Sequence, residues 1–438
     1  MAKLTFRGGI HPYDGKDLSK DKSIIDLIPG SLLIYPLSQH IGAPAKSIVS
    51  KGDHVFRGQM IAEGGGFVSA PVFASVSGIV KAIEPRKVAT GDFVMSIVIE
   101  NDGKYEEEFI YDEANPEELY YEEILERIQY AGIVGMGGAG FPTHVKLSPK
   151  DPYAIDYIIV NGAECEPYLT SDYRVMLEES EKVLGGLRII LSLFPDAYGI
   201  LGIEDNKPEC IKLYKQLVSS ENRISVRALK TKYPQGGERT MIYALTGRKI
   251  NSTMLPADVG VIVNNVDTVV AVYDAVAGGR PLMERIVTVT GDCIEQPRNY
   301  RVPIGMSYTE VLEAAGGFCK EPEKIICGGP MMGFAMPGTD VPVTKTSTAL
   351  LAFSKDAVAA TEAGPCINCG RCLEVCPGRV MPSKLANAAE HFDEETFLKY
   401  HGLECCECGC CSYICPAKRH LTQEIKTMRK TILAKKKK

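Results

Sequence analysis

Two runs of cysteine near the end of the chain constrain its fold more than any other feature. The first run, "CINCGRCLEVCP", has the spacing C-x2-C-x2-C-x3-C-P at Cys366, Cys369, Cys372 and Cys376. The second run, "CCECGCCSYICP", repeats that spacing at Cys405, Cys408, Cys411 and Cys415. Three thiolates at this spacing can bind three corners of one [4Fe-4S] cluster, and the fourth points away to complete the other cluster. We therefore predict one cluster on the first three cysteines of the first run with Cys415, and another on the first three of the second run with Cys376.

Zinc is the alternative for so many thiolates in one segment. Structural zinc sites usually take two separated cysteine pairs, whereas each run here has four cysteines and ends in Cys-Pro. Cys406 and Cys410 lie off the repeated register. The stretches between the runs, "PSKLANAAEHF" and "DEETFLKYHG", have helical character. The pattern favours a helical two-cluster ferredoxin-like domain over residues 356–438, ending in a basic tail.

Length and charge narrow the possibilities for the whole chain. Its 438 residues exceed what one core usually serves, so we expect several domains. A net charge of -6 argues against nucleic acid as the main partner. The first residues lack the apolar segment of a signal peptide, and runs such as "GLRIILSLF" are too short to span a bilayer. We therefore expect a cytoplasmic chain, in which 15 cysteines indicate metal or redox chemistry rather than disulfides.

Two smaller modules are expected from short strands separated by turns. Within residues 1–110, "KGDHVFRGQMIAE" and "VSAPVFASVSGIVKAIE" resemble the biotinyl/lipoyl-type β-sandwich. That family carries its prosthetic group on a lysine at a hairpin tip, but "GGGFVSAP" has none, so we expect the fold without a swinging arm. Residues 285–355 contain a pair of strands and the helical stretch "SYTEVLEAAGG". They resemble the soluble ligand-binding β-grasp module, for which we expect a structural role.

Residues 111–284 alternate strand and helix patterns. Strand character is found in "YIIVNGAE", "AYGILGIEDN", "ISVRALKTKYP" and "VGVIVNNVDT". Helical spacing is found in "NPEELYYEEILERIQYAGI" and in "SDYRVMLEESEKVLGGLRIILSLF", the latter as one long helix. This alternation predicts a Rossmann-like α/β domain with a largely parallel sheet, within a multidomain α/β chain.

The stretch "GIVGMGGAGFPTHVKL", Gly132 to Leu147, is the second feature that indicates chemistry. Glycine permits backbone conformations closed to other residues and lets a ligand lie directly on the main chain. Consecutive N–H groups can form an anion-binding concavity, and Lys146 adds a full positive charge for a phosphate. A glycine-rich loop alone is weak evidence, because a tight turn would also use it.

Four segments in order strengthen the interpretation. "GMGGAGFPTHVKL" resembles the flavin loop of the NADH-oxidising flavoprotein subunit of respiratory complex I. "VNGAECEP" is similar to that family's Asn-rich acidic loop, "YPQGGERTMIYALTG" to its Gly-Glu loop and helix, and "VNNVDTVV" to its Asn-Asn-Val-acid-Thr segment. The resemblance implies bound FMN, with NAD(H) stacked on the flavin ring.

The resemblance also implies roles for particular residues. The flavin phosphate side would be held by Gly137, Gly138, Gly140 and Lys146. The flavin would be hydrogen-bonded by Asn161, Asn264 and Asn265. The nicotinamide nucleotide would face Glu166 and Glu238, and Glu164 of the same acidic loop belongs to the predicted cofactor-binding set. No protein side chain is expected to act as a catalytic group, since the hydride chemistry takes place on FMN.

Two positions depart from that family. Ala163 stands where the family has Asp after Asn-Ala, and Gly237-Glu238 stands where it has two consecutive Glu. Each departure concerns one contact to the flavin or to the nucleotide.

Taken whole, the order of segments resembles the RnfC family of the Rnf complex, the membrane-bound ferredoxin–NAD oxidoreductase. This implies exchange of hydride between NAD(H) and FMN, and passage of single electrons through two [4Fe-4S] clusters to other Rnf membrane subunits, including a ferredoxin-like iron–sulfur subunit. It also implies a peripheral position on the cytoplasmic face of the cell membrane. A cobalamin reductase with a similar layout is the first alternative. A docking electron carrier with a vestigial flavin site is the second.

The last segment, "KTMRKTILAKKKK" from Lys426 to Lys438, carries seven positive charges and no acid. It is expected to be either a solvated helix end or a tether to an anionic membrane surface.

Overall fold

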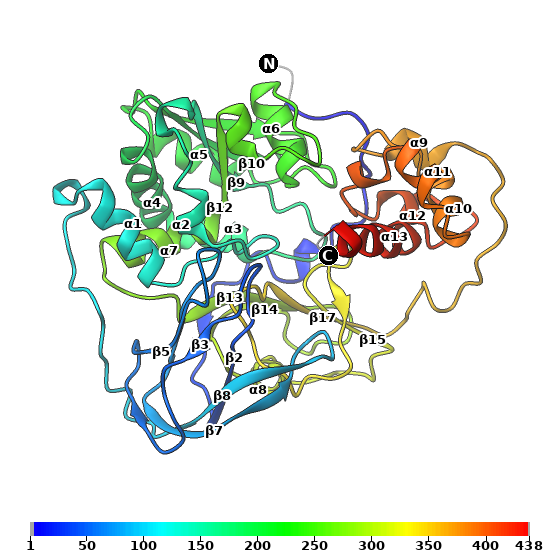
Figure 1. Ribbon diagram of the computed structural model, residues 1–438. Coiled ribbons are helices and arrows are strands. Elements are labelled where there is room, and N and C mark those ends of the chain that lie inside the picture. Colours follow the sequence, from blue (N-terminus) through cyan, green and yellow to red (C-terminus); the bar gives the residue numbers. More distant parts are fainter. Residues whose placement is uncertain (1–3, 437–438) are drawn as a thin grey trace.

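A four-stranded parallel sheet forms the layer that positions the site. The computed structural model describes residues 4–436, and Figure 1 shows this sheet in the green part of the chain. Its order is β11 (Ile224–Leu229), β10 (Tyr198–Glu204), β9 (Tyr157–Gly162) and β12 (Val261–Asn265), with every neighbouring pair parallel. The largely parallel sheet predicted from the strand–helix alternation is thus present.

Helices cover both faces of this sheet because its strands are apolar on both sides. One core contains Ile158, Val160 and residues of α4 (Ser180–Ser192) and α7 (Val266–Val276). The opposite core contains Ile159, Val263 and residues of α6 (Glu238–Thr246). The remaining helices of this part are α1 (Tyr121–Tyr130), α2 (Thr143–Lys146), α3 (Ser171–Glu178) and α5 (Pro208–Leu217).

One helix expectation needs correction. The stretch from Ser171 to Phe194 forms two helices, α3 and α4, rather than one long helix. The break falls at Glu179, whose backbone leaves the helical region at φ -123° and ψ 33°. Its carboxylate forms ion pairs with Arg301 and with Lys182. Arg301 lies 122 residues further along the chain, so a local pattern does not reveal the break.

The N-terminal part forms two small antiparallel sheets, drawn in blue at the bottom of Figure 1. One sheet has the order β2 (Leu32–Pro36), β8 (Phe93–Asn101), β7 (Gly78–Lys87) and β4 (His54–Val55). The other has β3 (Lys46–Ser47), β5 (Met60–Glu63) and β6 (Val72–Phe73). Leu33, Val55, Ile61 and Val72 lie in the core that these two sheets share with the parallel sheet.

A six-stranded mixed sheet follows the α/β part. Its order is β1 (Ile25–Asp26), β14 (Arg298–Pro303), β13 (Glu284–Thr290), β17 (Ala349–Phe353), β15 (Lys324–Cys327) and β16 (Phe334–Ala335). The antiparallel β13–β14 pair leads into α8 (Tyr308–Ala314), which begins at the capping box of Ser307 and Glu310. β1 comes from the N-terminal segment and pairs with β14, so the parts of the chain interweave.

The C-terminal part is helical and lies at the right of Figure 1. It consists of α9 (Arg371–Val375), α10 (Pro382–Glu390), α11 (Glu394–Lys399), α12 (Cys410–Ile414) and α13 (Leu421–Lys436). Its own core contains Leu385, Phe397, Ile425, Met428 and Ile432. Short 3-10 turns complete the chain at Lys16–Leu18, Pro116–Glu118, Pro152–Ala154, Pro256–Val259 and Gly402–Glu404.

The basic tail is therefore largely a packed helix. Met428 and Ile432 are 4% exposed, and both lie in the C-terminal core. A chain cut after Thr427 would therefore lose part of the C-terminal core. Lys437 and Lys438 of this basic segment lie outside the described residues.

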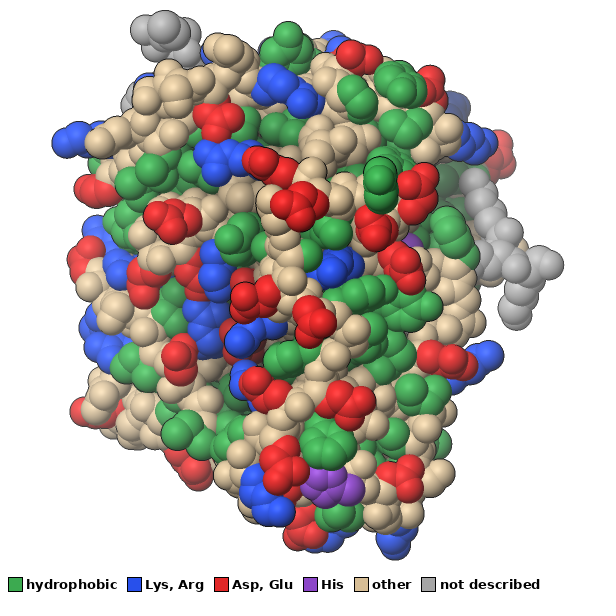
Figure 2. Space-filling view, turned by 90° about the vertical axis from the view of Figure 1, so that its left-hand side faces the viewer, with side chains coloured by type: hydrophobic (Ala, Val, Ile, Leu, Met, Phe, Trp, Pro, Cys, Tyr) green, Lys and Arg blue, Asp and Glu red, His purple; other side chains and the backbone are tan. Residues whose placement is uncertain are grey.

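Between Leu4 and Lys436, the structure has no helix with the length and apolarity needed to cross a bilayer. The face shown in Figure 2 interleaves basic and acidic side chains with scattered apolar ones.

Candidate flavin edge and cysteine pockets

The carboxyl ends of β9 and β12 define the candidate site. Both β10 and β11 lie on one side of β9, whereas β12 lies on its other side, so the strand order reverses between β9 and β12. In open α/β sheets, ligands bind outside the carboxyl ends of the strands at such a reversal. Asn161 stands at the end of β9, and Asn264 and Asn265 end β12. The structure thus brings all three predicted asparagines to one edge.

The glycine loop lies against the same edge. A Cβ added to Gly137 would lie 2.8 Å from Nδ2 of Asn265, whereas one added to Gly138 would meet nothing within 4 Å. Gly140 has a φ of +69°, in the left-handed region that favours glycine. The N–H of Met136 donates to Oγ1 of Thr268 at 3.0 Å and so holds the loop against α7. The loop therefore presents bare backbone, open at Gly138, beside the asparagines.

Asn264 provides the sharpest test of whether a ligand fits here. Its side chain is buried, at 1% exposure, and within the described residues neither Nδ2 nor Oδ1 has a hydrogen-bond partner. Leaving a buried amide unpaired costs on the order of 1–3 kcal/mol, so native proteins rarely do so. A flavin ring system carries both donors and acceptors that would satisfy such an amide. The residues present therefore fit FMN.

The other two asparagines are already partly engaged. Asn161 donates to the carbonyl of Gly236 at 2.8 Å and accepts from the N–H of Ala163 at 3.1 Å. Asn265 accepts from the N–H of Asp267 at 2.9 Å, a bond that caps the N-terminus of α7. It also donates to Oδ2 of Asp172 at 2.8 Å. These bonds fix the orientations of both side chains.

Lys146 lies at the same edge, on the short helix α2. Its ammonium donates to the carbonyl of Val263 on β12 at 2.8 Å. Burial lowers the pKa of Lys146, and the nearby carboxylate of Glu238 opposes that shift. Glu238 is the first residue of α6 and is exposed. The predicted phosphate contact of Lys146 stays a prediction, but its charge does lie beside the asparagines.

The acidic loop that follows β9 carries carboxylates with unusual surroundings. Oε2 of Glu166 accepts from the N–H of Met331 at 3.1 Å, while its shielded Oε1 forms no regular hydrogen bond within the described residues and has the Tyr233 hydroxyl as its neighbouring donor. Burial raises the pKa of Glu166 to about 7, against the lowering effect of the Met331 amide. Oε1 of Glu164 accepts from the N–H of Asp172 at 2.9 Å. Burial and the neighbouring Glu164 raise the pKa of Asp172 to about 7.

The predicted cluster cysteines gather in two pockets. The outer pocket is a cavity of about 160 Å³ lined by four of them, together with Ile367, Leu373, Met381 and Arg419; those four are Cys366, Cys369, Cys372 and Cys415. The inner pocket, about 20 Å³, is lined by the other four, Cys376, Cys405, Cys408 and Cys411, and also by Cys406 and Cys410. Each pocket thus joins three cysteines of one run with the last cysteine of the other.

Four thiols around one pocket are the donor set that a [4Fe-4S] cluster requires, so the residues present fit two clusters. Over residues 4–436, no three His, Cys, Asp or Glu side chains converge closely enough to hold a single metal ion. A cubane is larger than one ion, so its ligands stand further apart than those of a zinc site. The cluster assignments stay predictions.

The inner pocket adjoins the α/β part of the molecule. Cys410 shares a small apolar cluster with Ile10 and Tyr233, against which Cys165 and Cys408 also pack. Arg239 of α6 forms an ion pair with Glu404 at 3.1 Å. Glu404 also accepts from the N–H of Ser252 at 2.9 Å. The second cysteine run is therefore anchored to the sheet-and-helix layer, near the acidic loop.

Sequence reasoning missed several residues around this site. Asp172 lies in a stretch predicted only as helix, yet it is half-buried and accepts from Nδ2 of Asn265. Cys165 and Tyr233, which connect the acidic loop to the second cysteine run, were given no role. Lys16 lies in the N-terminal segment "FRGGIHPYDGK" and reaches the acidic loop. The only available signal was a polar or aromatic residue within an otherwise apolar stretch. That signal does not identify the contact, because in each case the partner residue lies far along the chain.

Three family models match the chain. They are the Nuo51 FMN-binding domain over residues 128–274, the RnfC barrel sandwich hybrid domain over residues 4–104 and the SLBB domain over residues 286–335. These matches confirm a multidomain α/β chain with a barrel-sandwich module before the flavin-type domain.

Curated relatives match over nearly the full length. A subunit of the proton-translocating ferredoxin:NAD(+) oxidoreductase complex of Clostridium ljungdahlii is 47% identical, over 97% of this chain and 93% of the relative. The corresponding protein of the Na(+)-translocating ferredoxin:NAD(+) oxidoreductase complex of Acetobacterium woodii is 42% identical, over 99% and 98%. Its counterpart in the ion-translocating oxidoreductase complex of Pseudomonas aeruginosa is 42% identical, over 91% of this chain but only 52% of the longer relative.

Among solved structures, an NAD+-reducing [NiFe]-hydrogenase in the air-oxidised state has a similar chain. It aligns with a TM-score of 0.51 and 21% identity, over 66% of this chain and 55% of that chain. This likeness supports the fold alone.

Proposed function

Since the chain belongs to the RnfC family, whose members are subunits of ion-translocating ferredoxin:NAD(+) oxidoreductase complexes known as Rnf complexes, we propose that it exchanges electrons between NAD(H) and an iron–sulfur partner protein. The chain is an oxidoreductase subunit with a Nuo51-type FMN-binding domain. We propose FMN and two [4Fe-4S] clusters as its resident groups. A bound flavin takes electrons from NADH as hydride and releases them singly, and the clusters carry one electron at a time.

The observation that carries the proposal is the buried amide of Asn264, unpaired within the described residues, on the strand whose next residue, Asn265, lies against Gly137 of the glycine loop. A ligand with hydrogen-bonding edges and a phosphate would satisfy both. In the proposal, Gly137, Gly138, Gly140 and Lys146 hold the phosphate side, and Asn161, Asn264 and Asn265 orient the ring. Asn161 and Asn265 are pre-oriented by their existing bonds.

The acidic residues would take the nucleotide side. Glu166 has a shielded oxygen without a regular hydrogen bond within the described residues, and Glu238 is exposed at the start of α6. Glu164 and Asp172 lie behind them and hold the loop to α3. The unshared oxygen of Glu166 suits the hydroxyl or amide donors of a nicotinamide nucleoside.

The two cysteine pockets would have different tasks. The inner pocket packs against the flavin side through the apolar cluster of Tyr233 and Cys410. In the outer pocket, Cys366 and Cys369 are exposed. The outer pocket is therefore the one that we expect a partner to approach. We propose that this partner is a ferredoxin-like iron–sulfur subunit of the Rnf complex.

The remaining parts of the proposal concern location. Membership of a membrane complex is proposed together with peripheral attachment at the cytoplasmic face, through other Rnf membrane subunits. A cobalamin reductase remains the alternative. A carrier with a vestigial flavin site is disfavoured by the unpaired Asn264, because a site without a ligand has no need for such an amide.

One experiment tests the proposal directly. The purified chain, reconstituted with FMN, iron and sulfide, should show flavin absorbance and the electron paramagnetic resonance signals of two reduced [4Fe-4S] clusters. It should also reduce an artificial dye with NADH. Absence of bound flavin, with intact clusters, would favour the carrier alternative. NADH-driven reduction of a cob(II)alamin substrate at a comparable rate would favour the cobalamin reductase.

A further inference from the structure

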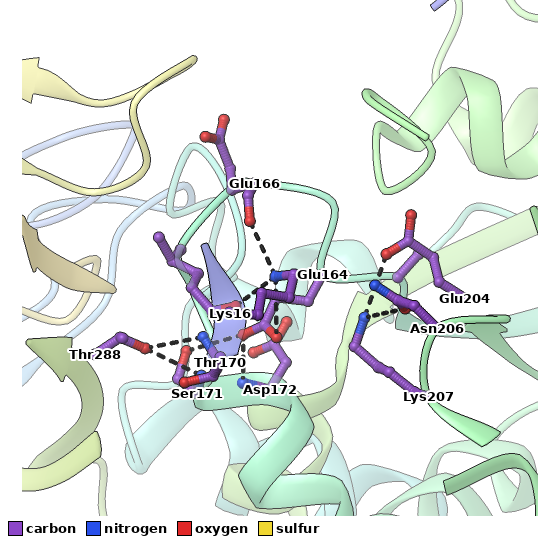
Figure 3. Close-up of polar contacts among 12 residues, drawn as sticks. Lys16, Glu164, Glu166, Thr170, Ser171, Asp172, Glu204, Asn206, Lys207 and Thr288 are labelled. Carbon is purple, nitrogen blue, oxygen red and sulfur yellow. Dashed lines mark hydrogen bonds and ion pairs between the residues drawn. The ribbon is translucent and has the colours of Figure 1, made fainter. Parts of the chain in front are cut away.

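Lys16 is a buried cation whose partners all belong to one loop. The lysine is 7% exposed. Its ammonium donates to the carbonyl of Glu166 at 3.1 Å and to the carbonyl of Leu169, and lies 3.7 Å from Oε2 of Glu164. Figure 3 shows the ammonium between the two glutamates. Lys16 thus binds the acidic loop, residues 163–170, from a segment about 150 positions earlier.

The neighbours of Lys16 hold the same loop. We call residues 13–19 the N-terminal strap. The ring of Tyr13 meets that of Tyr168 edge-on at 6.0 Å, and the N–H of Tyr168 donates to the carbonyl of Asp14 at 2.5 Å. The hydroxyls of Ser19 and Thr170 lie 2.7 Å apart. The strap therefore contacts the acidic loop along its second half.

Part of the backbone of the acidic loop is strained, so the loop needs the contacts of the N-terminal strap to keep its conformation. Tyr168 has a φ of +69°, a conformation that non-glycine residues rarely adopt. Strain of this kind persists only where the surroundings enforce it, and it often occurs at functional sites. The Tyr168 ring packs directly against Gly15 of the strap, where a Cβ would lie only 2.4 Å from the ring.

Electrostatic interactions connect Lys16 of the strap with a second buried ion pair at the end of β10. Lys207 forms a buried ion pair with Glu204, the last residue of β10, at 3.2 Å. Burial lowers the pKa of Lys16, while Glu164 and Glu204 oppose that shift. The four charges balance, and Figure 3 shows both pairs beneath the acidic loop. Removing Lys16 would take from the buried Glu164 its ion-pair partner at 3.7 Å, which is unfavourable.

We propose that Lys16 is a positioning residue for the nicotinamide nucleotide. It binds the backbone carbonyls of Glu166 and Leu169, and so fixes the stretch of loop from which the Glu166 side chain projects. The inference rests on the proposed function, because it assigns Glu166 to the nucleotide. It adds a residue outside the flavin-type domain to the determinants of NAD(H) binding.

The test compares Lys16→Met with wild type in the full reconstituted chain. We expect the Michaelis constant for NADH to rise roughly tenfold or more, the usual cost of losing a charged hydrogen bond. The turnover number, the flavin content and reduction of the clusters by light with a deazaflavin should stay at wild-type values. Lys16→Arg should recover part of the affinity. Lys20→Met, at an exposed lysine just beyond the strap, is the matched control.

The outcomes distinguish the proposed function from the role of Lys16. A wild-type chain that binds flavin but does not oxidise NADH would refute the proposed function. An active wild type with an unchanged Michaelis constant in Lys16→Met would overturn the role of Lys16. If Lys16→Met does not fold, Tyr13→Ala and Ser19→Ala loosen the same strap without disturbing a buried charge. Each should then raise the Michaelis constant, and unchanged values in both would equally overturn the inference.

Discussion

The two cysteine pockets share a backbone but differ in what surrounds them. Asn368 and Glu407 occupy the same place in their runs, and both have a left-handed backbone, with φ near 57° and 56°. Each run continues through a left-handed glycine, Gly370 or Gly409, into a short helix. The repeated spacing therefore produces a repeated conformation.

The two runs differ in the residues between their ligands and in what those residues contact. At the position where the first run has Ile367, 64% exposed, the second has Cys406, which is also exposed. Where the first run has Arg371, the second has Cys410, which is fully buried under the Tyr233 carbonyl. The outer pocket has two exposed ligands, Cys366 and Cys369, whereas the inner pocket packs on one side against the α/β part. The spacing of the ligands thus indicates the type of cluster, and the residues between the ligands determine which part of the molecule packs against each run.

The largest expected effect comes from removing one ligand in each pocket. Cys408→Ser, at the inner pocket, should abolish dye and partner reduction by NADH, while hydride transfer to the flavin survives. Cys369→Ser, at the outer pocket, should abolish partner reduction but leave the inner cluster reducible by NADH. Rapid mixing followed by electron paramagnetic resonance measures both. Loss of NADH-reducible signal in Cys369→Ser alone would reverse the assignment of inner and outer.

The next effect concerns the anchor of the inner pocket. Glu404→Gln removes the ion pair with Arg239 and weakens the bonds from Ser252. Hydrogen bonds to charged groups are worth about 1.5–3 kcal/mol, but this pair is partly exposed, so the loss should be nearer 1 kcal/mol. We expect cluster reduction by the reduced flavin to slow several-fold, with both clusters retained. Glu395→Gln, an exposed glutamate on α11, is the control.

A smaller effect is expected at the rim of the outer pocket. Ile367 and Leu373 are exposed and apolar beside the cysteines. Replacing Ile367 with Ser should weaken contact with the iron–sulfur partner by about 1 kcal/mol, since a partner would cover this side chain. The Michaelis constant for the partner should rise roughly fivefold. Dye reduction should not change, and an unchanged partner constant would show that the partner binds elsewhere.

The smallest effect tests the ligand set itself. Cys410 is buried but lies off the repeated register, so Cys410→Ala should keep the inner cluster and cost roughly 1 kcal/mol of stability. Iron content and the resonance signal should match wild type, and the melting temperature should fall by a few degrees. Loss of the inner cluster would mean that Cys410, rather than Cys411, is a ligand.

Local patterns predicted what local interactions determine. Strand–helix alternation predicted the parallel sheet of β9, β10 and β12, and the cysteine spacing predicted which thiols share a pocket. The break at Glu179 was missed because the ion-pair partner of Glu179, Arg301, lies far along the chain on β14. The strap was missed for the same reason, since nothing near Lys16 in the sequence indicates the acidic loop.

Which pocket lies inside was also beyond the sequence. The two runs are equivalent in spacing, and the difference arises from contacts to Tyr233, Arg239 and Ser252, far away along the chain. Cys410 in place of a charged residue was a hint that this run is the buried one, but the covering surface could be seen only in three dimensions.

The first residues of the chain also pair with distant segments, and this matters for how the protein is made. Leu4 bridges to Leu229, Ile10 to Tyr233, and the N–H of Gly9 donates to the carbonyl of Val375 at 2.8 Å. Figure 1 shows this segment running between the sheet layer and the C-terminal helices. A ribosome releases residue 9 long before residue 375, so the segment waits through most of translation without its partners. Contacts of such long range slow folding and lengthen the exposure of apolar residues. Biosynthesis of this chain should therefore depend on chaperones more than that of a protein built from independently folding modules. It should also require that the clusters are assembled before the N-terminal segment pairs with its distant partners.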